Sequence, residues 1–124
     1  AFPSSHPLAQ VAELTLEQLY SHPWVMYPAH DSHQRFLPFY GTAAGAPSAN
    51  AGSFTLALDL VEAGFGLAIA PHSLIETRCD LSARPLPGYP LLRRIGICYA
   101  VQAVENPAVN RLLERLNEVT ALAG

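Results

Sequence analysis

The clearest pattern of apolar and polar positions lies in residues 53–71, SFTLALDLVEAGFGLAIAP. Apolar side chains recur in its first half at helical spacing. The opposite face of this helix is polar and holds Thr55, Asp59 and Glu62. Ser53 is a typical N-cap residue, and Gly64 stands where a left-handed residue commonly ends a helix. Residues 67–70 form a short apolar run before a proline, which is typical of a parallel strand covered on both faces.

Capping patterns predict further helices. They begin at Thr15 with Gln18, at Asp31 with Gln34, at Ser73 with Glu76 (ending near Arg78), and at Asn106 with Pro107. Pro38 lies inside the second of these helices and removes one hydrogen bond, so a kink or an early end is expected there. The last helix has an apolar stripe made of Val109, Leu112, Leu113, Leu116 and Val119.

Extended segments are expected at residues 24–27, 46–51, 81–86 and 94–101, and proline-rich connectors at 1–7 and 85–90. Helices and strands therefore alternate, which predicts the α/β class with a mostly parallel sheet. Residues 8–86 are expected to form one α/β unit. The apolar strand and the helix that follow have no evident partner within it.

Composition excludes several classes of protein. The 124 residues carry a net charge of −3 and only 14% charged side chains, with no basic stripe, so this chain by itself is not expected to bind nucleic acid. No apolar run reaches the ~20 residues of a membrane span, and no signal peptide is visible. Cys79 and Cys98 lack metal spacing, so two free thiols in a reducing, cytoplasmic setting are favoured over one disulfide. The first residue is Ala1, which suggests a piece of a longer protein.

Catalytic and metal-binding patterns are weak. His30, Asp31 and His33 have residue types suited to zinc or iron, but no third ligand has clear spacing, and a capped helix start explains them as well. The chain has no GxSxG, and GFG at 64–66 is not a nucleotide loop. A nucleophile built from Cys79 and His72 rests on sequence distance alone. We therefore expect no enzyme activity, no catalytic residue, no bound metal and no cofactor.

Three loops offer a different kind of site. Residues 28–32, 50–53 and 71–73 each follow an expected strand and precede a helix, and ligands of open α/β sheets bind at such points. The small polar side chains in these loops suit a small anionic or polar metabolite. The alternative is that they only cap helices.

Four pieces of sequence follow one another in the chain: HPLA (6–9), LTLEQLYSHPWVMYP (14–28), SFTLALDLVEAGFGLAIAP (53–71) and ARPLPG (83–88). In order and spacing they resemble the effector-binding domain of LysR-type transcriptional regulators. The resemblance implies a truncated periplasmic-binding-protein-like domain of type II, in which a small effector binds between two Rossmann-like lobes. It assigns residues 1–88 to the second lobe, with a core at about 10–82 and connectors at 1–9 and 83–90. Residues 91–124 become a return strand and helix of the first lobe, and DNA is bound only through an N-terminal domain outside this sequence.

The resemblance also implies positions for the site. Effector contacts carried over to this chain fall on Pro28, His30, Asp31, Ser32, Asn50, Gly52, Ser53, Phe54, Pro71 and His72. The large side chains of His30 and His72 are expected either to fill the site or to tune it to an acidic effector. The helix that starts at Ser53 resembles one used in dimers, which implies an interface at Leu56, Asp59 and Leu60. The expected function is effector sensing, with a solute-binding lobe as the alternative and a small enzyme using His30 or His72 as the third.

Overall fold

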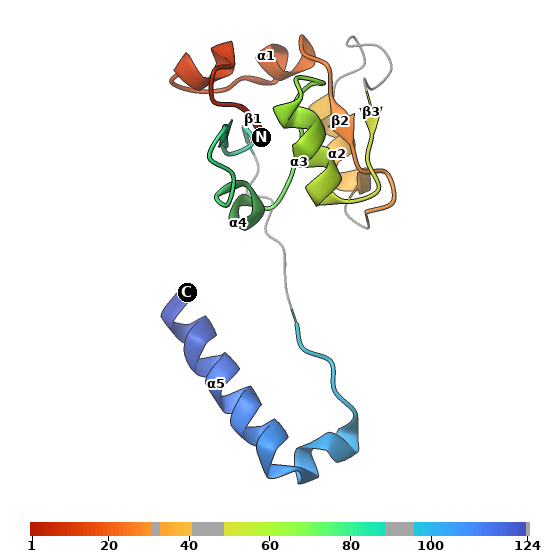
Figure 1. Ribbon diagram of the computed structural model, residues 1–124, viewed down its shortest axis with the longest axis vertical. Coiled ribbons are helices and arrows are strands. Elements are labelled where there is room, and N and C mark those ends of the chain that lie inside the picture. The colour runs from red at the N-terminus through yellow and green to blue at the C-terminus, as the bar shows by residue number, and fades with distance from the viewer. Residues whose placement is uncertain (31–32, 41–48, 89–95, 124) are drawn as a thin grey trace. The chain divides into compact units, whose positions relative to one another are not determined.

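Strands β2 (Val25–Met26) and β3 (Ala49–Asn50) pair in parallel, and β1 (Phe2–Pro3) pairs antiparallel with β4 (Leu81–Ser82). The computed structural model describes residues 1–30, 33–40, 49–88 and 96–123. The chain divides into two compact units, Ala1–Arg93 and Arg94–Gly124, and all four strands belong to the first (Figure 1).

Residues 67 and 68 lie between these two strand pairs. Leu67 forms a parallel bridge with Trp24, in which the Leu67 carbonyl accepts the N–H of Val25 at 2.8 Å. On the other side, the N–H of Ala68 donates to the carbonyl of Ala1 at 3.1 Å. The prediction of a strand over 67–70 is therefore wrong beyond this point. The neighbouring strands are only two residues long, so the ladder ends before Ile69.

The prediction of a loop over residues 1–7 is also wrong. Phe2 lies in β1, opposite Ser82 of β4, and only 3% of it is exposed. Burying a phenylalanine side chain contributes about 1.5–3 kcal/mol. This burial holds the start of the chain against the rest of the first unit.

Two hydrophobic cores fill the first unit. The first gathers the buried face of α3 (Phe54–Glu62) with residues of the strands and of α4, and contains Val25, Ala51, Ala57, Leu58, Val61, Ala68, Ile75 and Leu81. The second contains Phe2, Leu8, Leu19, Trp24, Phe36, Tyr40 and Leu67. In the second core the rings of Trp24 and Tyr40 pack edge to face at 5.0 Å. The indole N–H of Trp24 donates to the carbonyl of Leu19, so the polar atom of this buried ring is paired.

The ends of α3 are those that its sequence predicts. Ser53 Oγ accepts the N–H of Leu56 at 3.1 Å, as an N-cap should. At the other end, the N–H of Gly64 donates to Val61 and the N–H of Phe65 to Leu60, and Gly64 has a φ of +86°. These two bonds define a Schellman motif, which satisfies the last carbonyls of the helix.

The remaining elements of the first unit are short helices. They are η1 (Pro7–Gln10), α1 (Leu16–Tyr20), α2 (His33–Tyr40) and α4 (His72–Ile75). The capping box of Thr15 with Gln18 at the start of α1 is confirmed. Helix α2 continues through Pro38 to Tyr40, so no early end occurs there, while the predicted cap at Asp31 lies outside the described residues. The capping box predicted for Ser73 and Glu76 is wrong, because Glu76 instead lies 3.2 Å from His72 Nδ1.

The second unit contains η2 (Val101–Glu105) and α5 (Pro107–Ala123). Asn106 Oδ1 accepts the N–H of Ala108 at 2.9 Å, which confirms the predicted cap. The strand predicted over 94–101 is wrong for its described part, since residues 96–100 pair with no strand and Val101 begins η2. A strand needs a neighbour to take its backbone hydrogen bonds, and the described part of this unit provides none.

Apolar side chains of the second unit face solvent. Val101 is 81% exposed, and Ile97, Tyr99, Leu112 and Val119 are each more than half exposed. The predicted stripe of α5 is only partly covered, at Val109, Leu113 and Leu116. Of the helices in the described residues, none has both the length and the apolar character needed to cross a membrane.

Candidate functional site

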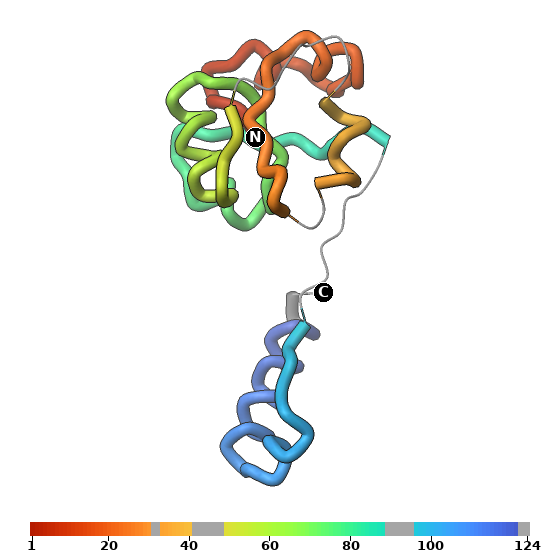
Figure 2. Tube along the Cα trace, turned by 90° about the vertical axis from the view of Figure 1, so that its right-hand side faces the viewer, coloured from red at the N-terminus to blue at the C-terminus, as the bar shows by residue number. Residues whose placement is uncertain are grey.

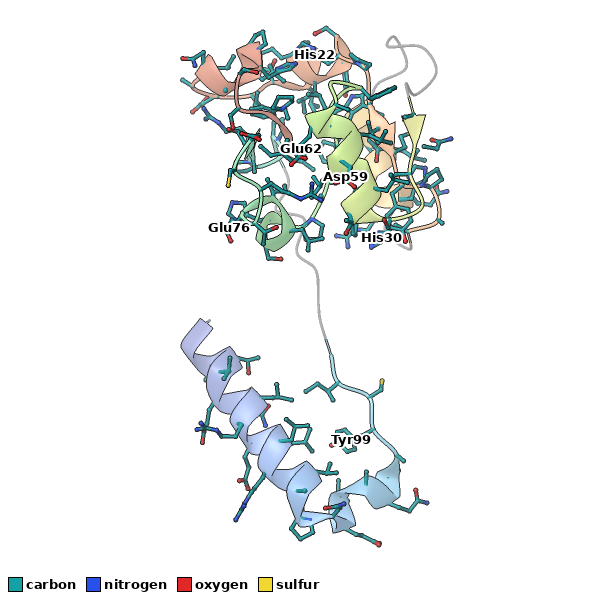
Figure 3. The ribbon with its side chains drawn as sticks, viewed as in Figure 1. His22, His30, Asp59, Glu62, Glu76 and Tyr99 are labelled. Carbon is teal, nitrogen blue, oxygen red and sulfur yellow. The ribbon has the colours of Figure 1, made fainter. Side chains whose placement is uncertain are left out.

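The loops at the end of β2, the start of α3 and the start of α4 gather at one end of the first unit. Figures 1 and 2, seen from two directions, both place these three points at the same end. Figure 3 shows His30 beside the N-terminal end of α3, with Asp59 and Glu62 further along the helix and His22 at the opposite end of the unit. The three loops are the ones that the sequence singles out, and two of them are in direct contact.

Aromatic rings make that contact. His30 follows β2, and its ring centroid lies 4.6 Å from that of Phe54, the first residue of α3. Tyr27 packs edge to face on Phe54 at 5.1 Å and lies 5.4 Å from His30. On its other side, His30 is almost parallel to Phe36 of α2, with 6.1 Å between centroids and 7° between planes. We call Tyr27, His30, Phe36 and Phe54 the aromatic cluster.

Polar groups beside the cluster come from the turn between β3 and α3. The N–H of Ala51 donates to the carbonyl of Met26 at 2.7 Å, which holds this turn against the end of β2. Asn50 and Gly52 are exposed, and Ser53 is partly exposed with its hydroxyl engaged as the N-cap of α3. The turn therefore brings an exposed amide side chain close to the start of α3.

The other predicted site residues have different surroundings. Pro28 is exposed, whereas Asp31 and Ser32 lie outside the described residues. His72 is exposed on α4, and its Nδ1 faces Glu76 of the same helix at 3.2 Å. Pro71 is partly exposed directly before α4. In the view of Figure 1, α4 lies on the side of α3 away from the end of β2.

Within the described residues, no three side chains of the types His, Cys, Asp and Glu are grouped closely enough to hold a metal ion. His33 turns toward the second core, where its ring centroid lies 6.0 Å from that of Tyr40, and its buried Nδ1 has no hydrogen-bond partner among the described residues. Cys79 and Cys98 are free and exposed.

Sequence reasoning missed two members of the cluster. Tyr27 ends the extended segment expected at residues 24–27, and Phe36 falls within the helix expected to begin at Asp31. A signal for Tyr27 exists, because a tyrosine at the end of a strand, directly before a proline loop, stands where ligands approach an α/β sheet. The position of Phe36 beneath His30 depends on how α2 packs, which periodicity does not reveal.

The three residues expected at a dimer interface differ in their environment. Leu56 is 45% exposed on α3. Leu60 instead packs partly buried against the first core. Asp59 is bound by Arg78 of the same chain, with 2.7 Å between Oδ1 and Nη1. Of the three, Leu56 is the apolar side chain that α3 presents to solvent.

Comparison with known proteins gives one finding. The first unit combines parallel strand pairing with helices, and its loops gather at the strand ends. In α/β domains, ligands bind at such an edge of the sheet. The sequence model of the LysR substrate binding domain matches residues 1–121, so this chain belongs to that family. The family has a periplasmic-binding-protein-like α/β fold and consists of the effector-sensing domains of transcription regulators rather than of enzymes. No curated protein and no solved structure gives a significant match.

Proposed function

We propose that this chain senses a small metabolite for a LysR-type regulator of transcription and binds it in a cleft between two Rossmann-like lobes. The family match over residues 1–121 carries this proposal. The gathering of the loops at 28–30, 50–54 and 71–72 at one end of the first unit supports it, because effectors of open α/β sheets bind at such an edge. In this proposal, residues 1–88 belong to the second lobe, and residues 91–124 return to the first.

The exposed apolar surface of the second unit supports this assignment. Residues 96–100 pair with no strand among the described residues, and Ile97, Tyr99 and Val101 face solvent. An apolar segment of this kind is suited to join a sheet supplied by another part of a lobe. The first lobe would supply both that sheet and the second wall of the effector cleft.

The mechanism follows from linkage between binding and conformation. An effector that contacts both lobes stabilises the closed arrangement and so shifts the population of lobe arrangements. In a cytoplasmic homo-oligomer, this shift would change the spacing of DNA-binding domains carried on a separate N-terminal part of the protein. Effector and DNA then alter each other's affinity by the same factor.

The test uses the full-length protein encoded by the gene. A metabolite library is screened for compounds that raise its melting temperature, and each hit is tested for a change in affinity for the DNA upstream of the gene. We expect at least one hit to change DNA affinity. A gene that encodes a secretion signal and no DNA-binding domain would contradict the proposal and favour a solute-binding lobe.

A further inference from the structure

Three of the four rings of the aromatic cluster are not members of the two hydrophobic cores as far as the described residues show. Phe36 belongs to the second core, whereas Tyr27, His30 and Phe54 are partly exposed. Each core is already filled by its own side chains, including Trp24 and Tyr40 in the second. Three large rings are thus placed together on the partly exposed surface of the first unit.

The geometry of the rings favours a planar partner. Tyr27 stands perpendicular to Phe54, with 87° between the two planes, and His30 is tilted by 56° to the same ring. Aromatic rings pack favourably on one another edge to face or tilted, so the partly exposed surface of this cluster suits a further aromatic ring. A saturated ring of similar size lacks the π system that makes such contacts favourable.

The position of the cluster matches its proposed use. His30 comes from the loop after β2, Tyr27 directly follows that strand, and Phe54 starts α3. These are the points at which the proposed effector cleft lies, and Figure 3 shows His30 at this end of α3. Ser53 directly precedes Phe54, and Asn50 is exposed in the same turn, so polar groups that could bind a substituent of the ligand are available near the start of α3.

We propose that the effector is a small planar aromatic compound whose ring packs against Tyr27, His30 and Phe54. This inference rests on the proposed function, since it identifies the chemical class of the ligand at the proposed site. It predicts that aromatic compounds bind in preference to saturated analogues of equal charge and similar size.

The experiment measures binding to the full-length protein by saturation-transfer NMR and calorimetry. The probes are matched pairs: benzoate with cyclohexanecarboxylate, phenylacetate with cyclohexylacetate, and benzamide with cyclohexanecarboxamide. We expect at least one aromatic member to bind about threefold to tenfold more tightly than its saturated partner, the range of a single aromatic contact. Equal binding within every pair, or binding of none of these compounds, would overturn the inference.

Two variants locate the binding on the cluster. Phe54→Leu and Tyr27→Leu keep apolar volume but remove one ring each, and we expect either change to abolish the preference for the aromatic member. Phe65→Leu is the matched control, because Phe65 is a 49% exposed ring outside the cluster, and this variant should keep the preference. Unchanged melting temperatures show that the variants fold, and where Phe54→Leu fails to fold, Tyr27→Leu decides. A preference that survives in the folded ring variants overturns the inference.

The outcome also separates this inference from the proposed function. If a non-aromatic metabolite from the library changes DNA affinity and aromatic probes do not bind, the aromatic inference fails and effector sensing stands. If aromatic probes bind with the expected preference but no compound changes DNA affinity, regulation fails while the ligand class stands. Trimethylammonium compounds such as choline are included, since a preference for them over the aromatic probes would identify a cation site and overturn the inference.

Discussion

Arg78 Nη1 lies 2.7 Å from Asp59 Oδ1, and the same nitrogen lies 3.2 Å from Glu62 Oε1. The second guanidinium nitrogen donates to the carbonyl of Thr55 at 3.4 Å. These bonds raise the pKa of Arg78, with Asp59 as the largest cause. Arg78, which follows α4 in the chain, thus binds three residues on the polar face of α3, the helix that begins at the aromatic cluster.

Removing this guanidinium should loosen α3. We expect Arg78→Met to lower the urea midpoint of the first unit at low salt, and the loss to shrink at about 1 M salt, where exposed charges are screened. Arg78→Lys should lower the urea midpoint less than Arg78→Met does, but it should not reach the native value. The reason is that one ammonium cannot bind both carboxylates in the planar geometry of a guanidinium. Unfolding is followed by the fluorescence of Trp24, the single tryptophan. Arg115→Gln is the control, since Arg115 pairs with Glu118 within α5, and an equal loss there would contradict the prediction.

Gly66 should be the least replaceable glycine among those described. Its φ is +148°, and a Cβ at this position would overlap the carbonyl oxygen of Pro23, next to the bridge of Trp24 with Leu67. We expect Gly66→Ala to reduce the free energy of unfolding by at least about 2 kcal/mol, from backbone strain and overpacking together. Gly52→Ala is the control, because a Cβ there meets nothing within 4 Å. Similar unfolding free energies for the two variants would show that the approach of Gly66 to Pro23 is not tight.

Tyr40 should make the fold sensitive to alkali. Burial raises its pKa from 10.0 to about 12. The unfolded chain therefore releases the tyrosine proton first, so stability should fall as pH rises from about 10 to about 12. Tyr40→Phe should reduce this fall, measured as the urea midpoint against pH. Tyr99→Phe, which changes a 52% exposed ring of the second unit, should leave the profile as it is.

His6 should produce the opposite dependence in acid. Its Nδ1 accepts the N–H of Leu8 at 3.1 Å, and its ring centroid lies 4.7 Å from that of His22. Burial, and to a smaller extent the charge of His22, lower the pKa of His6 below 6.5. The unfolded chain takes up the proton first as pH falls through 6.5, so stability is lost on the acid side of this value.

The variant His6→Asn isolates this effect. Asparagine keeps an acceptor for the N–H of Leu8 but does not titrate, so the acid loss should be smaller than in the native chain. The melting temperatures of the native chain and of this variant, measured above and below pH 6.5, give the size of the acid loss in each. His72→Gln is the control, since His72 is exposed on α4 and should leave the acid loss unchanged.

Leu56 should report on self-association. We propose that α3 contributes to the homo-oligomer interface, and Leu56 is its 45% exposed apolar side chain. Leu56→Asp in the full-length protein should shift sedimentation toward smaller species, while the unfolding free energy of an exposed position changes by less than about 0.5 kcal/mol. Leu74→Asp, on α4 and 37% exposed, is the matched control. An unchanged sedimentation mass for Leu56→Asp would contradict the proposal that α3 contributes to the interface.

Local signals in the sequence were enough to predict the ends of several helices. Thr15 with Gln18, Ser53 and Asn106 all cap as expected, and Gly64 ends α3 with a positive φ. Each of these interactions joins residues a few positions apart. Their energies depend on side chains and backbone within one or two turns, so the chain carries the information locally.

Pairing between distant segments was predicted less well. Phe2 belongs to a strand rather than a loop, and, within the part of the chain that the structure describes, Ile69 has no ladder partner and residues 96–100 form no strand. In every case the deciding factor is whether another segment, remote in sequence, supplies backbone groups. Apolar or β-branched residues show that a segment can be a strand but not that it has a neighbour.

The candidate site shows the same division. The sequence by itself predicted three loops after expected strands, with His30 in the first loop and Phe54 directly after the second, and, by resemblance, it predicted the family. Only the tertiary structure decided that His30, Phe54 and Tyr27 meet in one aromatic cluster and that Asp59 is bound by Arg78. The physical reason is range: caps and turns are set by neighbours in the chain, whereas a binding surface is set by how separate elements pack.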